Sequence, residues 1–245
     1  MRPVIPDTIR NSQGERLEFT YHPGAPDSTT LVVLGHGVTG NKDRPLLVEL
    51  AGTLARSGIH AVRFSFAGNG GSEGRFEDAT ITKEVVDLGA VLDALAGWKL
   101  GYAGHSMGGA VGVLRAADDE RLQFLISLAG MAHTADFARR EFGEVTPDAG
   151  CMWEKPECPL SRTFMDDTAR IGSVKEPARR VRVPWLFVHG LADDVVPPRD
   201  SRDLHEVARE PKRLVELPDA DHVFSGPHAR TMAETVAAWI RESGF

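Results

Sequence analysis

The sequence has few of the features that mark disulfide-rich, membrane-spanning or nucleic-acid-binding proteins. Only two cysteines occur among its 245 residues, too few for a disulfide framework. No apolar run approaches the length of a membrane span, and residues 1–7 contain no apolar core of a signal peptide. Basic residues are scattered and the net charge is −7, which argues against nucleic acid or an anionic membrane as the main partner. We therefore expect a globular, cytoplasmic protein.

The two cysteines, Cys151 and Cys158, lie close together in one segment. Their spacing matches neither a C-x-x-C redox motif nor a zinc site. Two small packing residues are the simpler interpretation, and a local disulfide is the alternative.

The chain does contain a regular alternation of apolar runs and amphipathic helices. Residues 3–22 suggest a hairpin, with strand-like stretches at 4–9 and 17–21 joined by turn-forming residues. Strands are then expected at 31–34, 61–66, 100–103, 122–128, 185–188 and 213–217, and helices at 45–57, 81–97, 109–117, 201–208 and 228–242. This order predicts an α/β fold, one domain over residues 1–245 with a mainly parallel sheet and helices on both faces.

One segment, 131–183, interrupts the alternation and contains no expected sheet strand. A structureless loop of that length is uncommon in a compact domain, so we expect short helices near 135–142 and 163–171. The segment leaves the sheet just after a strand, at the edge where parallel sheets place their ligands, and we interpret it as an inserted lid. A peripheral excursion without a role in the site is the alternative.

The strongest chemical signal is Gly104-His105-Ser106-Met107-Gly108, which lies between an apolar stretch and a run typical of a helix. A G-x-S-x-G sequence in that setting describes a sharp turn that pushes one serine hydroxyl out of the top of a sheet. The two outer glycines have a steric reason, because strand and helix nearly touch there and leave no room for a Cβ. Taken alone, the pentapeptide is also compatible with a plain strand-to-helix loop.

A serine hydroxyl needs a general base, and the chain offers nine histidines for that role. His222 follows the strand at 213–217 in a loop at a C-terminal strand end, where catalytic side chains gather. His228, at the start of the last helix, is the alternative. His105 lies in the serine turn and His36 in the loop after the strand at 31–34. Packing and loop shaping are the expected roles of both.

The acid that orients the imidazole is expected at the exit of the strand at 185–188. Two aspartates follow that strand, and we prefer Asp193 to its neighbour Asp194. The order along the chain is then Ser106, Asp193, His222, which is the nucleophile, acid and base order of one particular sheet fold.

The oxyanion of an acyl-transfer intermediate needs two hydrogen-bond donors. One is expected from the backbone amide of Met107, at the start of the helix after the serine, where free N–H groups and the helix dipole favour negative charge. The other is expected from the loop after the strand at 31–34, from the amide of Val38 in His36-Gly37-Val38.

These motifs together resemble the serine hydrolases of the α/β-hydrolase superfamily over nearly the whole chain. The resemblance rests on His36-Gly37, Gly104-His105-Ser106-Met107-Gly108-Gly109, His189-Gly190 with Asp193, and Asp221-His222. More narrowly, residues 36–41 and 64–74 are similar to bacterial cinnamoyl and feruloyl esterases and related carboxylesterases, which carry an inserted lid where this chain has 131–183. The resemblance implies ester hydrolysis through an acyl-enzyme.

The expected function is therefore that of a carboxylesterase acting on small to medium esters, hydroxycinnamoyl or feruloyl esters among them, without a metal or an organic cofactor. A peptidase or a carbon–carbon bond hydrolase on the same triad is the first alternative, and a non-catalytic ligand-binding protein is the second. Dehalogenase-type and dienelactone-type chemistry is disfavoured, because those relatives place Asp or Cys where Ser106 stands. We expect a small-molecule ester as the partner and leave a homodimer open.

Four large apolar side chains of the lid are candidate walls of the substrate pocket, although each is equally suited to the core of the lid. They are Phe142, Met152, Trp153 and Phe164.

Overall fold

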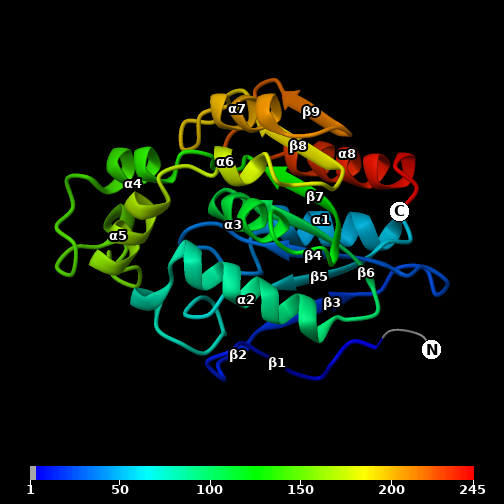
Figure 1. The fold of residues 1–245 in the computed structure, drawn as a ribbon, viewed down its shortest axis with the longest axis horizontal. Helices are drawn as coiled ribbons and strands as arrows, with labels where there is room; N and C mark the ends of the chain where they lie inside the picture. Colours follow the sequence, from blue (N-terminus) through cyan, green and yellow to red (C-terminus); the bar gives the residue numbers. More distant parts are fainter. Residues whose placement is uncertain (1–3) are drawn as a thin grey trace.

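The fold is built around a seven-stranded sheet, which the computed structural model shows between helices on both faces (Figure 1). The structure describes residues 4–245. Across the sheet the strands are β3 (Phe19–His22), β5 (His60–Phe64), β4 (Thr30–Gly35), β6 (Lys99–His105), β7 (Leu122–Leu128), β8 (Trp185–Gly190) and β9 (Lys212–Leu217). Only β3 runs antiparallel to its neighbour, and all the other pairs are parallel. This confirms the predicted α/β class and its mainly parallel sheet.

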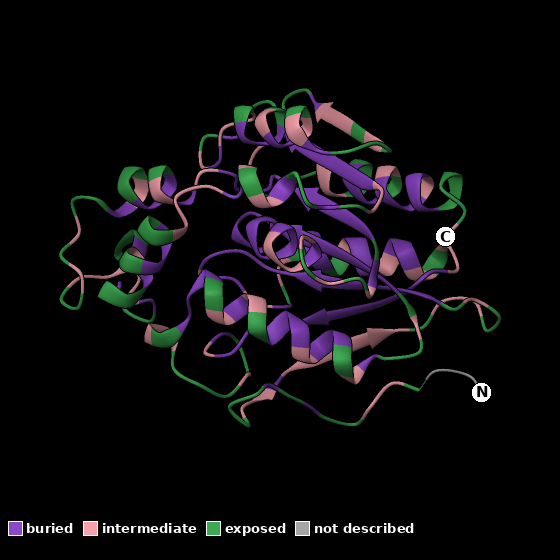
Figure 2. Ribbon diagram, in the orientation of Figure 1, coloured by how far each residue is buried: buried purple, intermediate pink, exposed green. Residues whose placement is uncertain are grey.

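The central strands are buried on both faces, as their continuous apolar runs predict. Every residue of β4, β5 and β8 is buried, and Figure 2 shows these strands as the buried interior of the molecule. One face is covered by α1 (Pro45–Arg56) and α8 (His228–Glu242), and the other by α2 (Ile81–Ala94), α3 (Met107–Ala116) and α7 (Arg199–Val207). Two apolar cores result, one on each side of the sheet.

The N-terminal hairpin is shorter than the sequence predicts. It consists of β1 (Ile9–Arg10) and β2 (Arg16–Leu17), and the expected strand from residue 4 forms only at Ile9. Pro6 has no N–H to donate to a ladder, and Val4 is largely exposed, so neither supports a strand there. Residue 3 lies outside the described residues. The stretch expected as one strand at 17–21 is divided, because β3 pairs with β5 instead of β1.

The segment between β7 and β8 is mainly helical, and most of it lies beyond the ends of the parallel strands (Figure 1). It contains α4 (Thr134–Phe142), the short 3-10 turn η2 (Met152–Glu154), α5 (Arg162–Ile171) and α6 (Lys175–Ala178). The two helices expected from the sequence thus occur within a residue of their predicted bounds. We call residues 131–183 the lid.

Buried carboxylates attach the lid to the rest of the fold at two points. Asp200, at the start of α7, accepts hydrogen bonds from the backbone amides of Ala132 (2.8 Å) and His133 (3.2 Å). Asp167 of α5 accepts from both the amide (3.0 Å) and the hydroxyl (2.6 Å) of Thr82 in the first turn of α2. The lid is therefore attached to two helices, α7 and α2, that cover the same face of the sheet.

Cys151 and Cys158 carry free thiols, so the local disulfide is not formed. Across residues 4–245, no helix combines the length and the apolar character that a membrane crossing requires.

Candidate active site

The serine turn joins β6 to α3 in a strained backbone conformation. Ser106 has a φ of 57° and is the residue immediately before α3. A Cβ built on Gly104 would lie 2.1 Å from the carbonyl oxygen of Gly108, so strand and helix touch at this point. This confirms the predicted steric reason for Gly104, whereas a Cβ on Gly108 would lie 2.5 Å from the carbonyl oxygen of His36. A left-handed serine that persists in a buried turn is a conformation typical of functional sites.

Asp193 and His222 lie together at the neighbouring strand ends. Nδ1 of His222 is 2.8 Å from Oδ2 of Asp193, and the carboxylate is fully buried. The other oxygen, Oδ1, accepts from the amides of Val195 (2.9 Å) and Val196 (2.8 Å). Because Nδ1 of His222 faces a carboxylate, it carries the proton and leaves Nε2 free to accept one.

The environment of Asp193 keeps its carboxylate charged. Burial alone would raise the pKa of Asp193, but the hydrogen bonds from His189 and His222 outweigh it and hold this pKa far below its ordinary value. The side chain can therefore stabilise positive charge on the imidazole of His222 without becoming protonated itself.

His189 is a second partner of Asp193 that the sequence did not reveal. Its Nε2 lies 3.1 Å from Oδ2 of Asp193 and 2.9 Å from the carbonyl oxygen of Val196, and therefore donates. Its Nδ1 accepts from the hydroxyl of Ser201 at 2.6 Å. His189 is the fifth residue of β8, and its place at the end of the strand that precedes Asp193 was the only signal for this role.

Two further histidines hold the loops of the site, as expected from the sequence. Nε2 of His105 donates to the carbonyl oxygen of His222 (2.9 Å), and Nδ1 of His36 donates to that of Gly37 (2.9 Å). Burial lowers the pKa of His36 to about 4, and burial together with the nearby His222 lowers that of His105 to about 3. Both rings are therefore neutral at pH 7.

Two backbone amides near Ser106 have no hydrogen-bond partner in residues 4–245. They belong to Val38, in the loop after β4, and to Met107, the first residue of α3. That loop approaches the serine closely, since a Cβ on Gly37 would lie 2.7 Å from the Cβ of Ser106. A free amide at a helix start carries partial positive charge and suits an anion.

Ser106 and His222 open into one cavity of about 190 Å³. Ser106 Oγ makes no hydrogen bond to any described residue, including His222. In the absence of substrate, the distance between a nucleophile and its base is often longer than a hydrogen bond. The other lining residues come from the loop after β4, the lid and the loops after β8 and β9: Gly37, Val38, Thr39, Arg44, His105, Trp153, Lys155, Val195 and Val223.

Of the four predicted pocket walls, only Trp153 lines this cavity. It lies in η2 with a φ of 47°, and its ring packs edge-on against that of Phe142 at 4.9 Å. Phe142, Met152 and Phe164 are each at most 2 % exposed and form the apolar core of the lid instead. Side chains buried in this core are not available to a ligand. Among the weaker candidates, Asp194 is exposed, and neither its side chain nor that of His228 forms a hydrogen bond with Asp193 or His222.

The sheet order, the helices on both faces and the serine turn define an α/β-hydrolase fold. Residues 26–148, half of the chain, match the serine aminopeptidase S33 family of α/β hydrolases, and the chain belongs to this family. The protein is thus a hydrolase with an esterase-like fold.

Several known proteins are similar along most of the chain. Rv2307c of Mycobacterium tuberculosis is 28 % identical, over 96 % of this chain and 78 % of its own length. A bovine mitochondrial protein, palmitoyl-protein thioesterase ABHD10, is 26 % identical over 56 % of this chain and 48 % of its own. The ferulic-acid-bound structure of Est1E from Butyrivibrio proteoclasticus superposes with a TM-score of 0.86 at 25 % identity, covering 97 % of this chain and 98 % of that one.

Proposed function

We propose that the protein is a serine carboxylesterase, with Ser106 as nucleophile, His222 as general base and Asp193 as the orienting acid. The observation that carries this proposal is the buried Asp193–His222 pair beside a strained serine in the same cavity. The backbone amides of Val38 and Met107 serve as the oxyanion hole, because both are free and flank Ser106.

In the proposed mechanism, Oγ of Ser106 attacks the ester carbonyl carbon and its proton passes to Nε2 of His222. The carbonyl oxygen takes the electron pair and is held by the two amides. When the tetrahedral intermediate collapses, the C–O bond to the alcohol breaks and His222 gives its proton to the leaving oxygen. Water, deprotonated by His222, then attacks the acyl-enzyme, and the acid and free serine are released. This route requires no metal or cofactor.

Two similarities favour an ester or a thioester as substrate. Est1E, whose structure holds ferulic acid, shares the fold over nearly the whole chain, and the bovine relative is a palmitoyl-protein thioesterase. We therefore include hydroxycinnamate esters among the proposed substrates. The cavity is bounded by Trp153, a side chain on which an aromatic acyl group can pack.

A peptidase is the second candidate, because the family is described as serine aminopeptidase. An aminopeptidase must bind a substrate ammonium group, and acidic side chains serve that purpose. None of the residues that line this cavity is acidic, while Arg44 and Lys155 are basic. The lining therefore favours an ester over an N-terminal peptide.

A panel of chromogenic substrates tests the proposal. It comprises 4-nitrophenyl esters graded by acyl chain, methyl ferulate, an acyl thioester and aminoacyl 4-nitroanilides, each with the unmodified protein and with Ser106→Ala. We expect ester turnover that falls at least about a thousandfold in Ser106→Ala. Turnover of the anilides alone would favour the peptidase, and turnover unchanged by Ser106→Ala would refute the proposed nucleophile.

A further inference from the structure

Two basic side chains line the active-site cavity without a carboxylate partner. Arg44 is the residue before α1 and is half-buried; its Nη2 donates only to the carbonyl oxygen of Thr39, at 3.2 Å. Lys155 follows η2 in the lid, and its Nζ lies 6.0 Å from the ring centre of Trp153. Across the part of the chain that the structure describes, neither forms an ion pair.

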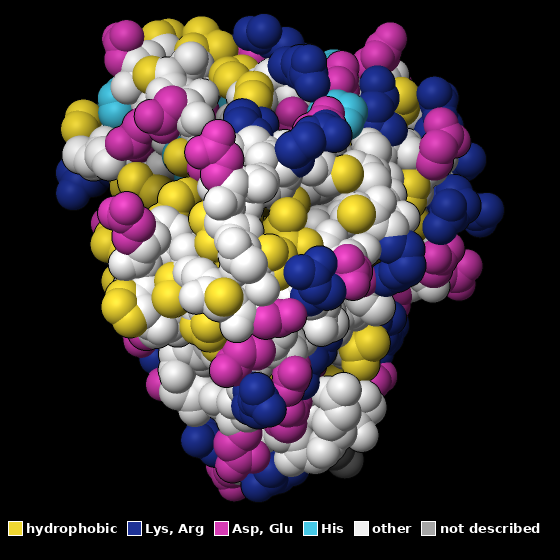
Figure 3. Space-filling model, turned by 90° about the vertical axis from the view of Figure 1, so that its left-hand side faces the viewer, with side chains coloured by type: hydrophobic (Ala, Val, Ile, Leu, Met, Phe, Trp, Pro, Cys, Tyr) yellow, Lys and Arg dark blue, Asp and Glu magenta, His cyan; other side chains and the backbone are white. Residues whose placement is uncertain are grey.

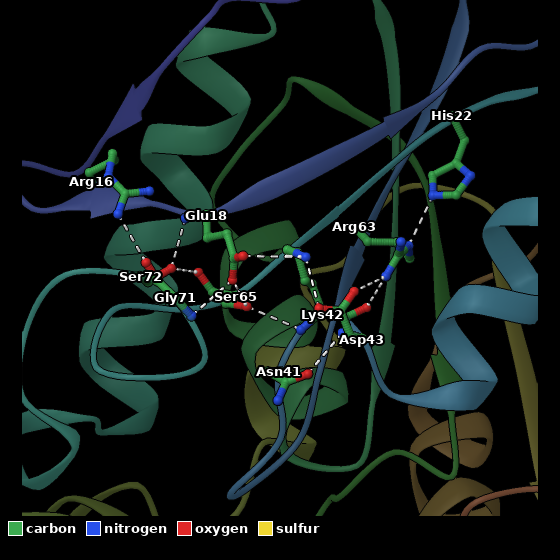
Figure 4. A network of polar contacts seen from close by, with 10 residues as sticks. All are labelled: Arg16, Glu18, His22, Asn41, Lys42, Asp43, Arg63, Ser65, Gly71 and Ser72. Carbon is green, nitrogen blue, oxygen red and sulfur yellow. Dashed lines mark hydrogen bonds and ion pairs between the residues drawn. The ribbon is translucent and has the colours of Figure 1, made fainter.

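The basic residues beside Arg44 show the contrast. Lys42 is paired with Glu18 (3.4 Å) and Asp43 (2.8 Å), and Arg63 is paired with Asp43 (2.8 Å). Figure 4 shows these contacts as one network that joins the loop after β4 to Glu18 and Arg63. Their charges are neutralised inside the fold, so Lys42 and Arg63 serve to fix the loop. Arg44, the residue that follows Asp43, has no carboxylate partner among the described residues, so its charge in the cavity lining is unpaired.

The network also explains how Arg44 is held in place. The backbone amide of Lys42 donates to the hydroxyl of Ser65 (3.1 Å), and that of Asp43 to the side chain of Asn41 (2.9 Å). The loop is therefore anchored on the residues immediately before Arg44. A preorganised cation loses little freedom when a ligand binds, which favours a charge contact at this position.

Thr39 adds a second polar group to the same wall of the cavity. Its hydroxyl is buried without a hydrogen-bond partner in residues 4–245, and its backbone has a φ of 55°. An unpaired buried hydroxyl and a left-handed β-branched residue each carry a cost in stability. Both features occur in the residue whose carbonyl oxygen accepts the hydrogen bond from Arg44. This indicates that this wall of the cavity is shaped for a ligand.

The surface of the molecule at the end that carries the lid helices has no marked excess of one charge. Figure 3 views the end of the molecule that carries α4 and α5, and acidic and basic side chains are interspersed over it. Inside the cavity the balance is different, because its lining includes two cations and no acid. In addition to burial, the charge of Arg44 lowers the pKa of His36 and of His105, so its field reaches the site.

We propose that the substrate of this site carries a carboxylate, which Arg44 and Lys155 bind while Ser106 attacks the ester. The inference rests on the proposed function and specifies its substrate class, an ester of a short dicarboxylic acid or an ester whose alcohol part bears a carboxylate. Arg44 presents a planar fork suited to a carboxylate, and Lys155 adds a point charge from the lid. Arg44 comes from the loop after β4 and Lys155 from the lid, so an anion bound by both would link these two parts of the cavity lining.

Two pairs of matched esters test this inference. For the acyl side they are 4-nitrophenyl hydrogen adipate and its primary amide; for the alcohol side, 4-acetoxybenzoate and 4-acetoxybenzamide. Within each pair only the charge changes. We expect the anionic member of one pair to have a kcat/KM about tenfold or more above its amide, and this ratio to fall as salt rises. The pair that shows the preference identifies the side of the ester that carries the carboxylate.

Variants then assign the preference to the two cations. Arg44→Gln and Lys155→Gln should each lower the ratio about tenfold or bring it to one, and Arg44→Lys should keep part of it. Arg162→Gln is the matched control, because Arg162 is an exposed lid arginine outside the cavity, and it should leave the ratio unchanged. A ratio near one in both pairs, or a ratio that Arg44→Gln and Lys155→Gln together do not change, would overturn the inference.

A binding measurement separates this inference from the proposed reaction. In Ser106→Ala, calorimetry should show tighter binding of the anionic ester than of its amide, and Arg44→Gln should remove the difference. Selective binding without turnover of any ester by the unmodified protein would refute the proposed function alone. Turnover of neutral esters without selectivity for charge in either assay would refute this inference alone.

Discussion

At the scale of residues, the site is built around one carboxylate that is fully satisfied. Asp193 accepts hydrogen bonds from two backbone amides with one oxygen and from two histidines with the other. Such a carboxylate cannot turn away from His222 without leaving several donors unpaired. The position of the imidazole is therefore determined by the loop after β8 more than by His222 itself.

Asp193→Asn should reduce kcat by about a thousandfold to ten-thousandfold, because an amide at this position favours the wrong tautomer of His222. The variant is nearly isosteric, so circular dichroism should show an unchanged fold. Asp194→Asn is the matched control and should keep its activity, because Asp194 is exposed. Equal losses in the two variants would exclude Asp193 as the orienting acid.

Gly37→Ala tests the close approach between the loop after β4 and the nucleophile. The new Cβ would lie 2.7 Å from that of Ser106, so the loop must move away and shift the amide of Val38. We expect kcat/KM for esters to fall at least about tenfold. Gly52→Ala in α1 is the control, since its Cβ would meet only the flexible end of Arg56, and its activity should be retained. An active Gly37→Ala enzyme would argue against the Val38 amide as a donor.

The site residues were predictable where a motif and a strand end coincide. Ser106, Asp193 and His222 each follow a strand of the sheet, β6, β8 and β9 respectively, and their order along the chain matched one known fold. The contact of His189 with Asp193 was not predictable, because it depends on the side-chain direction at the end of β8. Arg44 and Lys155 carry no motif, and only the folded loop and lid bring them to one cavity.

At the scale of elements, the lid is an anchored layer and not a free flap. Its entry is held by Asp200, and α5 is held to the first turn of α2 by Asp167. Its interior is apolar and includes three of the four aromatic and sulfur-containing side chains that were predicted as pocket walls. Among the described residues, the lid lines the cavity through Trp153 of η2 and Lys155, which follows it.

Asp167→Ala should loosen the lid, because two hydrogen bonds to Thr82 at the start of α2 are lost. We expect the free energy of unfolding to fall by about 1–2 kcal/mol and tryptic cleavage within the lid to become faster. Asp166→Ala, at the exposed neighbouring position, should behave like the unmodified protein. Urea unfolding and limited proteolysis provide the two readouts, and identical cleavage rates in both variants would contradict the anchored lid.

The elements were predicted most accurately where apolar periodicity is strong. The bounds of β7, α1, α2 and α8 differ from the predicted ones by three residues or fewer. The N-terminal hairpin was predicted too long, because Val and Ile beside a proline suggested a strand that has no pairing partner. The path of the lid between its helices was not predictable, since no periodic pattern specifies it.

At the scale of the whole molecule, buried neutral histidines make the fold sensitive to acid. Burial lowers the pKa of His36 to about 4, whereas an unfolded histidine titrates near 6.5. Between these values the unfolded chain binds a proton that the folded protein does not, so stability falls as pH falls. For His36 alone the loss between pH 7 and pH 4 is about 3 kcal/mol.

Urea unfolding at pH 7 and at pH 4 measures this loss. In His36→Gln the difference between the two pH values should shrink by about 3 kcal/mol, whatever the absolute stability of the variant. His228→Gln, at a partly exposed position, should keep the full difference. Parallel pH dependences of the unmodified protein and His36→Gln would show that His36 does not titrate in this way.

The central claim, that Ser106 is an activated nucleophile, is tested most directly by covalent labelling with a fluorophosphonate. Intact mass and peptide mapping report whether the folded protein reacts and at which residue. We predict one label per chain on Ser106, no label in Ser106→Ala, and much slower labelling in His222→Ala, because the base is missing. A folded protein that stays unlabelled, or that is labelled equally well in Ser106→Ala, would contradict the account.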